Sequence, residues 1–214
     1  VFIDEYFSIP QHSSYCDDKN FYDLYFPDVL RPKTICRKIS SILLDDNYNP
    51  ISLDNKLLNK LKNGAIVKPS KFSSSGKNII FIAPNSTDDE IRNALMSTGP
   101  FICQELIHQH PEMSKLHAKS VNTIRMLTFF WKDEVMLLST IVRMGQGDSM
   151  VDNRGAGGML CGVKQDGYLQ EFGYDSFPNR YQTSPDGYRF SEIQIPNFDA
   201  LKKMVKKLHY RLCG

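Results

Sequence analysis

The sequence predicts an α+β protein whose strands pair mostly in an antiparallel way. The predicted elements run from helices to strand-loop-strand, helix and strand, and then to two consecutive hairpins. A doubly wound fold would instead alternate strands and helices along the chain. The chain has 214 residues, of which 41% are hydrophobic and 23% charged, which is typical of a globular protein. This length suits one large domain or two small lobes around a cleft.

The first fifty residues, rich in Tyr, Phe, Asp and Pro, predict short helices and turns. Ser52 is the expected N-cap of the next helix, and Gly64 is its expected stop. The apolar residues of this helix recur at helical spacing and form its core face: Leu53, Leu57, Leu58 and Leu61.

A strand-loop-strand unit follows. Residues 65–68 read as a short strand ended by Pro69, residues 73–77 as a polar loop, and residues 78–82 as a second strand. Thr87 and Glu90 then form a capping box, which predicts a helix that ends at Gly99. Residues 101–107 are expected to form a further strand.

The second half predicts two hairpins and a last helix. The strands at 121–131 and 135–143 are joined by residues 132–134. The strands at 158–163 and 168–172 turn at Asp166-Gly167. The last helix is expected at about 198–208, with Asn197 as its cap.

Charge and cysteine content narrow the class of protein. The net charge of +2 provides no global field for nucleic acid or an anionic membrane. The five cysteines are odd in number and form no CxxC pair, which argues against a disulfide scaffold or a structural zinc site and favours a reducing cytoplasm. No apolar run reaches transmembrane length and no signal-like segment opens the chain, which lacks an initiator Met and so is expected to be a fragment.

Common phosphate and catalytic motifs are missing. Asn78 follows Gly76-Lys77, which breaks the P-loop pattern, and Leu160 takes the place of the third glycine of a dinucleotide fingerprint. Neither GxSxG nor HExxH occurs. Lys68, at the end of a strand, could instead point into a cleft beneath the 73–77 loop, although composition alone slightly favours an ordinary solvated hairpin.

Two further groups of residues have competing interpretations. His108, His110, Glu112 and His117 could bind a metal, but their spacing favours a polar connection after a strand. A second polar group could bind a phosphate or carboxylate through arginine, although each member taken singly suits turn or strand structure equally well: Asn122, Thr123, Arg125, Arg143, Asp152 and Asn153.

Taken together, these residues resemble the ATP-grasp superfamily. The first half carries a "DK…P.T" entry, a "vKP…gGkG" strand and loop, and a strand that meets adenine, in the segments 18–34, 66–77 and 102–107. The second half carries "svNTlR" and "vDN…GG" pieces, at 120–125 and 151–158, which are similar to the branch associated with sugar transfer and polysaccharide biosynthesis. The resemblance covers residues 18 to 208.

The resemblance implies a fold of two α+β lobes with mostly antiparallel sheets that flank a nucleotide cleft. It implies a lead-in segment at 1–60, a small lobe at 61–108 and a large lobe at 109–214. ATP would contact the lysines, loop and adenine strand: Lys19, Lys68, Ser74, Ser75, Gly76, Lys77, Gln104, Glu105, Leu106 and Ile107. Arg125 and Arg143 would act on the transferred phosphate or the acceptor carboxylate, and the acceptor side would be lined by Asn122, Thr123, Asp152 and Asn153.

The implied chemistry is ATP-dependent ligation, in which a carboxylate is phosphorylated and an amine or similar nucleophile displaces phosphate. Alternatives are a nucleotide-binding module without catalysis and a small-molecule kinase. Family members continue into a "GWD" segment and an "E.N" pair that hold Mg²⁺, whereas this sequence stops at Cys213-Gly214. The expectation is therefore either an incomplete copy of the domain or a protein without that metal site. The implied partners are a nucleotide, a small-molecule or sugar-linked acceptor, and polysaccharide-assembly enzymes.

Overall fold

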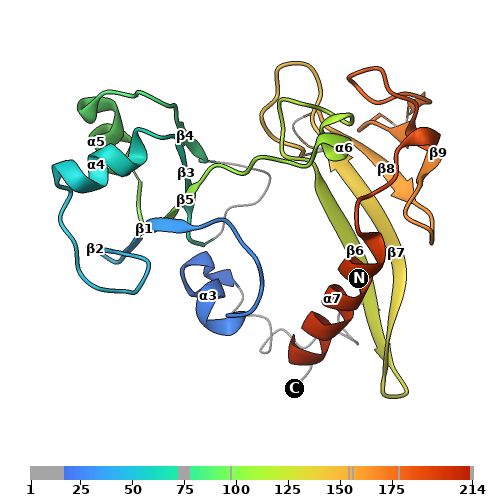
Figure 1. Ribbon diagram of the computed structural model, residues 1–214, viewed down its shortest axis with the longest axis horizontal. Coiled ribbons are helices and arrows are strands. Elements are labelled where there is room, and N and C mark those ends of the chain that lie inside the picture. The colour runs from blue at the N-terminus through green and yellow to red at the C-terminus, as the bar shows by residue number, and fades with distance from the viewer. Residues whose placement is uncertain are drawn as a thin grey trace. The chain divides into compact units, whose positions relative to one another are not determined.

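The computed structural model confirms the α+β class, with two five-stranded sheets and few helices (Figure 1). It describes residues 17–71, 78–96, 98–153, 155, 157–177 and 179–212. The chain forms two compact units, unit 1 and unit 2, which divide between Ile107 and His108. The division into a lead-in segment and two lobes stays a prediction.

Unit 1 is built on a sheet with the strand order β2-β1-β5-β3-β4, in which every neighbouring pair is antiparallel. A 3₁₀ turn and a short helix, η2 and α3, precede the sheet in sequence. The bounds are η2 Lys19–Phe21, α3 Tyr22–Tyr25, β1 Thr34–Ile39, β2 Ile42–Leu44, α4 Asn55–Leu61, β3 Ala65–Pro69, β4 Ile80–Ile82, α5 Asp88–Met96 and β5 Phe101–Glu105.

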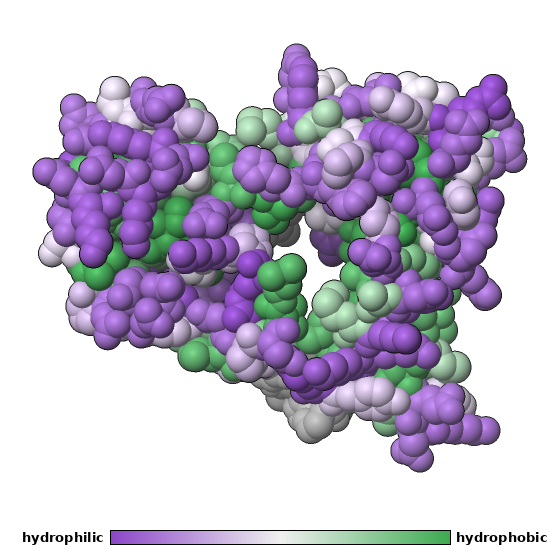
Figure 2. Space-filling view, viewed as in Figure 1, coloured by the Kyte–Doolittle hydropathy of each residue, from purple (hydrophilic) through white to green (hydrophobic). Residues whose placement is uncertain are grey.

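Helices α4 and α5 cover one face of this sheet and close the core of unit 1. Their apolar side chains pack on strand residues that alternate toward this face, among them Cys36, Val67 and Cys103. In Figure 2 the outer surface of the helices is largely hydrophilic, and hydrophobic residues show between the helices and the sheet. The opposite face of the sheet is therefore left for other contacts.

Unit 2 is built on a second sheet, with the order β10-β9-β8-β7-β6. Its long hairpin, β6 and β7, packs against the C-terminal helix α7, where Thr128 Oγ1 lies 2.7 Å from His209 Nδ1. The core gathers between the sheet, α6, η4 and α7. The bounds are α6 Pro111–Ser114, β6 Thr123–Trp131, β7 Glu134–Met144, β8 Met159–Val163, β9 Leu169–Tyr174, β10 Arg180–Tyr181, η4 Phe190–Glu192 and α7 Phe198–Leu212.

Several predicted elements are confirmed. The capping box is present, because Thr87 N donates to Glu90 Oε2 at 2.8 Å and Glu90 N donates to Thr87 Oγ1 at 3.3 Å. Both predicted hairpins form, and the helix at 198 extends to Leu212. None of the described helices is long and apolar enough to cross a membrane.

Three local predictions are wrong. The first fifty residues contain strands β1 and β2 as well as short helices, because β1 pairs with β5 more than sixty residues away. Asp54, not Ser52, caps α4 by accepting from Leu57 N at 2.9 Å. Strand β5 ends at Glu105, so Leu106 and Ile107 lie beyond it.

The turn between β8 and β9 generates a testable prediction on stability. Gly167 has φ +88°, and an added Cβ would lie 2.9 Å from Phe198 Cβ. We expect Gly167→Ala to lower the free energy of unfolding by about 2 kcal/mol, since backbone strain and crowding add. Chemical denaturation measures the loss. Gly187→Ala is the matched control, because its φ is +89° but no atom lies within 4 Å of the added Cβ. Equal losses would show that crowding at Phe198 contributes nothing.

Candidate functional site

Lys68 lies on the face of the unit 1 sheet that α4 and α5 leave uncovered. Val67 pairs with Cys103 on the core side, so Lys68 and its partner Ile102 belong to the opposite face. Lys68 Nζ donates to Gln104 Oε1 at 3.3 Å, which places Gln104 on the same face. Strand alternation therefore directs a cation to this face, as the sequence predicts for β3.

Lys19 reaches the end of the same strand from the η2 segment. Its backbone N donates to Ser70 O at 2.9 Å, and its Nζ lies 3.4 Å from the same oxygen. Asp18 caps η2 by accepting from Asn20 N at 3.0 Å. The structure thus brings together two lysines that are 49 positions apart in sequence.

The electrostatics of the two lysines are unfavourable without a ligand. Burial lowers the pKa of Lys68, and the Lys19 ammonium lowers it further. Burial also lowers the pKa of Lys19, against the opposing effects of Asp18 and Asp17. Among the residues that the structure describes, no carboxylate forms an ion pair with Lys68. An anionic ligand would relieve this repulsion.

Gln104 connects Lys68 to the segment before β1. Its Oε1 accepts from Lys68, and its Nε2 donates to Pro32 O at 3.3 Å. The next residue, Glu105, is exposed, and its backbone N donates to Lys33 O at 3.0 Å. Leu106 is half-buried and Ile107 is exposed, at the end of unit 1. Their predicted contacts with adenine stay a prediction.

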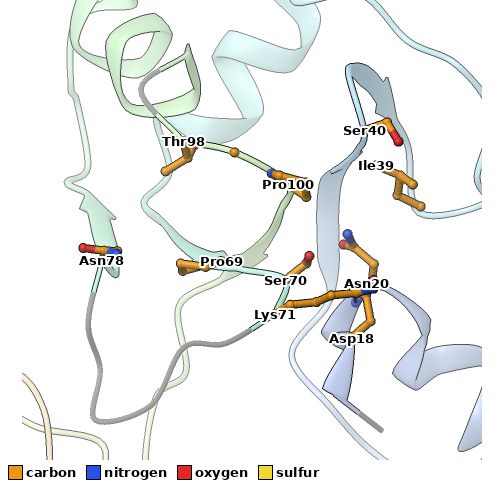
Figure 3. A pocket seen from close by; sticks show the side chains of 11 residues that line it. Asp18, Asn20, Ile39, Ser40, Pro69, Ser70, Lys71, Asn78, Thr98 and Pro100 are labelled. Carbon is orange, nitrogen blue, oxygen red and sulfur yellow. Dashed lines mark hydrogen bonds and ion pairs between the residues drawn. The ribbon is translucent and has the colours of Figure 1, made fainter. Parts of the chain in front are cut away.

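A cavity of about 530 Å³ lies beside the Lys19–Ser70 contact, where β1 and β3 end and β5 begins (Figure 3). Its polar lining includes the buried side chain of Asn20, while Ile39, Pro69 and Pro100 supply apolar surface. Lys71 Nζ lies 3.6 Å from Asp18 Oδ2 at this cavity. The neighbours of Lys19 in sequence, Asp18 and Asn20, line this cavity, whereas Lys19 and Lys68 themselves do not.

In unit 2, Asp152 ties together the first residue of β6 and a residue near the end of β7. Thr123 and Arg143 are paired across the two strands, so they share a face. Thr123 Oγ1 donates to Asp152 Oδ2, and Arg143 Nη2 donates to Asp152 Oδ1 at 3.0 Å. The side chains of Arg143 and Asp152 are only 16% and 14% exposed. This arrangement confines the arginine to one position.

Arg125 lies two residues beyond Thr123 on β6 and therefore on the same face as Thr123 and Arg143. It is exposed and forms no ion pair with any residue in the described part of the chain. Ile124 and Val142 point to the opposite, core face. Arg125 is thus available to a ligand, whereas Arg143 is already paired.

Asn122 lies elsewhere, in a buried hydrogen-bond network before β6. Its Nδ2 donates to Gln109 Oε1 at 3.0 Å, to Met113 O at 2.8 Å and to His117 O at 2.9 Å. Ser120 Oγ donates to Asn122 Oδ1 at 3.0 Å. With its amide satisfied in this way, Asn122 shapes the loop that leads into β6. Gln109 and Ser120 were not identified as structural residues from the sequence.

Asn153 forms a tight turn with the glycines that follow. Its Oδ1 accepts from Gly155 N at 2.6 Å, and its carbonyl accepts from Gly158 N at 2.9 Å. A Cβ on Gly158 would lie 2.7 Å from Met144 O. The turn interpretation of this segment therefore accounts for Asn153, and Gly158 has no space for a side chain.

Ser74, Ser75, Gly76 and Lys77 lie outside the described residues. His110 caps α6 by accepting from Glu112 N at 3.1 Å, and His117 Nε2 lies 3.1 Å from Gly147 O. The described residues contain no group of three or more His, Cys, Asp or Glu side chains that could hold a metal ion.

Sequence reasoning missed the polar cluster of Asp23, Arg37 and Tyr48, which lies beneath the Lys19 segment. The only sequence signal is Arg37, a charge inside an apolar strand pattern. In a sequence, such a charge indicates a solvent-facing strand position, unless it is known which segment of the chain covers it.

The fold is that of an α+β protein in which Lys19 is brought to the end of the strand that carries Lys68. The model of the sugar-transfer associated ATP-grasp family matches residues 8–214, and the chain belongs to this family. Comparisons with curated proteins and with solved structures found no match. The family implies an ATP-binding, ligase-like function.

The repulsion at Lys68 generates a prediction on stability. We expect Lys68→Met to raise the free energy of unfolding at pH 7 by about 1 kcal/mol, because it removes a buried charge. The pKa of Lys68 is lower in the folded state than the usual 10.5, so the unfolded chain binds more protons between the two values. The gain should therefore shrink as the pH approaches 10.5. Chemical denaturation tests this, with exposed Lys60→Met as control; a destabilised Lys68→Met protein contradicts it.

The Asp152 contacts generate a second prediction. We expect Asp152→Asn to lower the free energy of unfolding by about 1–2 kcal/mol, because it leaves the half-buried Arg143 without a carboxylate. Asp148→Asn is the control, since Asp148 is 95% exposed and pairs with exposed Lys119. Denaturation curves that shift equally for both variants would rule out a special contribution from the Asp152 pair.

Proposed function

We propose that this protein binds ATP through Lys19 and Lys68 and uses it to activate a carboxylate as an acyl phosphate. An amine or similar nucleophile then takes the acyl group, as in the ATP-grasp ligases. The observation that carries the proposal is the pair of lysines on one sheet face, with Lys68 lacking a carboxylate partner among the described residues. Gln104 supports Lys68, and Glu105, Leu106 and Ile107 are the proposed adenine contacts.

The charge balance of unit 1 supports the phosphate assignment. Burial and the Lys19 ammonium disfavour the charged form of Lys68, and the triphosphate would supply the negative charge that offsets them. Binding of the ligand would offset the electrostatic repulsion between the two lysines. A neutral ligand would not offset this repulsion, which is why a polyanion is the better candidate.

The proposed reaction has two steps. A carboxylate oxygen of the acceptor attacks the γ-phosphorus of ATP, the bond to the β–γ bridging oxygen breaks, and ADP leaves with the electron pair. The nucleophile's nitrogen then attacks the acyl carbon, the carbon–oxygen bond breaks, phosphate leaves, and the nitrogen loses its proton. Lysine and arginine would stabilise the charge on the transferred phosphoryl group.

In unit 2 we assign that role to Arg125, with Arg143 held by Asp152 for the phosphate or for the acceptor carboxylate. Thr123 and Asn153 complete the proposed acceptor side, and Asn122 shapes the loop that leads to it. The family implies Mg²⁺ as well. Both carboxylate oxygens of Asp152 accept hydrogen bonds, from Thr123 and Arg143, and the described residues offer no acidic cluster, so these residues do not fit the metal.

The cellular setting is part of the same proposal. The family's association with sugar transfer supports an acceptor that is sugar-linked, and a role in cell-surface polysaccharide biosynthesis or modification together with the assembly enzymes. The odd number of cysteines and the lack of a CxxC pair support a reducing cytoplasm.

ATP binding by variants tests the proposal. We expect Lys68→Met to weaken ATP binding at least tenfold, because a charge-assisted contact to phosphate contributes about 1.5–3 kcal/mol. Titration calorimetry measures it, with Lys60→Met as the control that keeps its affinity. A Lys68→Met protein that binds ATP like the parent would show that the site is elsewhere.

Product analysis separates the reaction classes. Hydroxylamine should trap an acyl phosphate as a hydroxamate when ATP and carboxylate-bearing sugars are supplied together. Stable transfer of phosphate to a hydroxyl group would identify a kinase instead. ATP binding with neither product, across carboxylate and hydroxyl acceptors, would favour a nucleotide-binding module.

A further inference from the structure

Arg37 is a charged side chain with no exposed surface in the middle of strand β1. It pairs with Ile102 of β5, and Ile102 pairs in turn with Lys68 of β3. The three side chains therefore form one row on the face that α4 and α5 leave uncovered. Arg37 and Lys68 lie two strands apart, which is about 10 Å in a sheet.

The guanidinium of Arg37 holds the chain segment that covers it. Its Nη2 donates to Asp23 Oδ2 at 2.6 Å and its Nη1 to Asp23 Oδ1 at 3.2 Å, so the pairing is two-pronged. Nη1 also donates to the carbonyl of Asn20, and Nη2 to Asp46 O at 3.3 Å. Asn20 directly follows Lys19. The contact of Arg37 with the Asn20 carbonyl therefore lies one residue from the lysine that is proposed to bind phosphate.

Tyr48 reinforces the same segment from the loop after β2. Its hydroxyl lies 2.8 Å from Asn20 O and 2.6 Å from Asp23 Oδ1, and the guanidinium carbon of Arg37 lies 3.9 Å from the centre of its ring. Tyr48 adopts a left-handed φ of +64°, which is unfavourable for a tyrosine. Asp45 stabilises this turn by accepting from Asn47 N and Asn49 N, each at 2.8 Å.

The segment depends on these contacts for its position. It consists of a 3₁₀ turn of three residues and a helix of four residues, too short to be stable in isolation. Repulsion from Lys68 also opposes the placement of Lys19. A buried ion pair adds little net stability to a fold, so the cluster of Asp23, Arg37 and Tyr48 is better explained by what it positions.

We propose that Asp23, Arg37 and Tyr48 are positioning residues that hold Lys19 in place for the phosphates of ATP. None of the three contacts the ligand. They act through Asn20 and Lys19, whose backbone N is fixed on Ser70 O. The inference rests on the proposed ATP site and adds to it the residues that preorganise one of its two cations.

Tyr48→Phe tests the proposal in the full chain, because it removes one hydroxyl and keeps the ring. Without ligand, we expect hydrogen exchange at the Lys19 amide to accelerate about fivefold, as one net hydrogen bond implies, and exchange at Val67 and Cys103 to stay unchanged. The second measurement is a double-mutant cycle with Lys19→Ala, read by calorimetric titration with ATP. Tyr48→Phe should weaken ATP binding about fivefold in the parent and less than twofold when Lys19 is absent.

The outcomes separate this inference from the proposed function. Equal losses of ATP affinity in both backgrounds, or no loss in the parent, overturn the positioning role while ATP binding stands. Unchanged exchange at the Lys19 amide overturns it without any ligand. A parent protein that binds no ATP overturns the proposed function, and this inference with it.

Two further variants complete the design. Ile91→Val shortens a core side chain of α5, and we expect it to lower stability without changing ATP affinity. Arg37→Lys removes the two-pronged pairing with Asp23, so its loss of ATP affinity should exceed that of Tyr48→Phe. If Arg37→Lys does not fold, the Tyr48→Phe cycle decides alone. A loss of affinity in Ile91→Val equal to that in Tyr48→Phe would reduce the effect to general destabilisation and overturn the proposal.

Discussion

The buried guanidinium of Arg37 is the constraint around which the uncovered face of unit 1 is arranged. A charge withdrawn from water is costly unless it is paired and hydrogen-bonded, and the two Nη atoms of Arg37 donate to Asp23 and to the carbonyl of Asn20. These contacts hold the η2 and α3 segment on the sheet beside β1. The rest of that face, over β3, is left to Lys68. Lys19 lies at the end of β3, where its N donates to Ser70 O, and the next residue, Asn20, accepts from Arg37.

The two units differ in whether a buried cation has a carboxylate partner among the described residues. In unit 1, burial and the proximity of Lys19 lower the pKa of Lys68, and the described residues give Lys68 no carboxylate partner. In unit 2, Asp152 pairs with Arg143 and fixes its guanidinium, while Arg125 remains exposed. A site that keeps unneutralised charge is unfavourable to the fold and favourable to an anionic ligand.

Local signals predicted much of the fold. The Thr87–Glu90 box, the Asp166-Gly167 turn and the alternation around Lys68 each depend on neighbours in sequence, and each is confirmed. Strand β1 was missed, since its partner β5 lies far along the chain and Arg37 interrupts its apolar pattern. Asn122 was assigned to the acceptor side on sequence, but in the structure its amide binds Gln109 and two backbone carbonyls, a network that depends on how the loops meet.

By itself, the sequence determined the α+β class, the family resemblance and the strand that carries Lys68. These follow from residue periodicity, capping and turn chemistry, which act over a few residues. Only the tertiary structure decided that Lys19 lies on Ser70, that Asp152 joins Thr123 to Arg143, and that Arg37 is buried. Those facts depend on strand order and on contacts between distant segments. Such contacts form only when the sheet brings the segments together, so no local pattern encodes them.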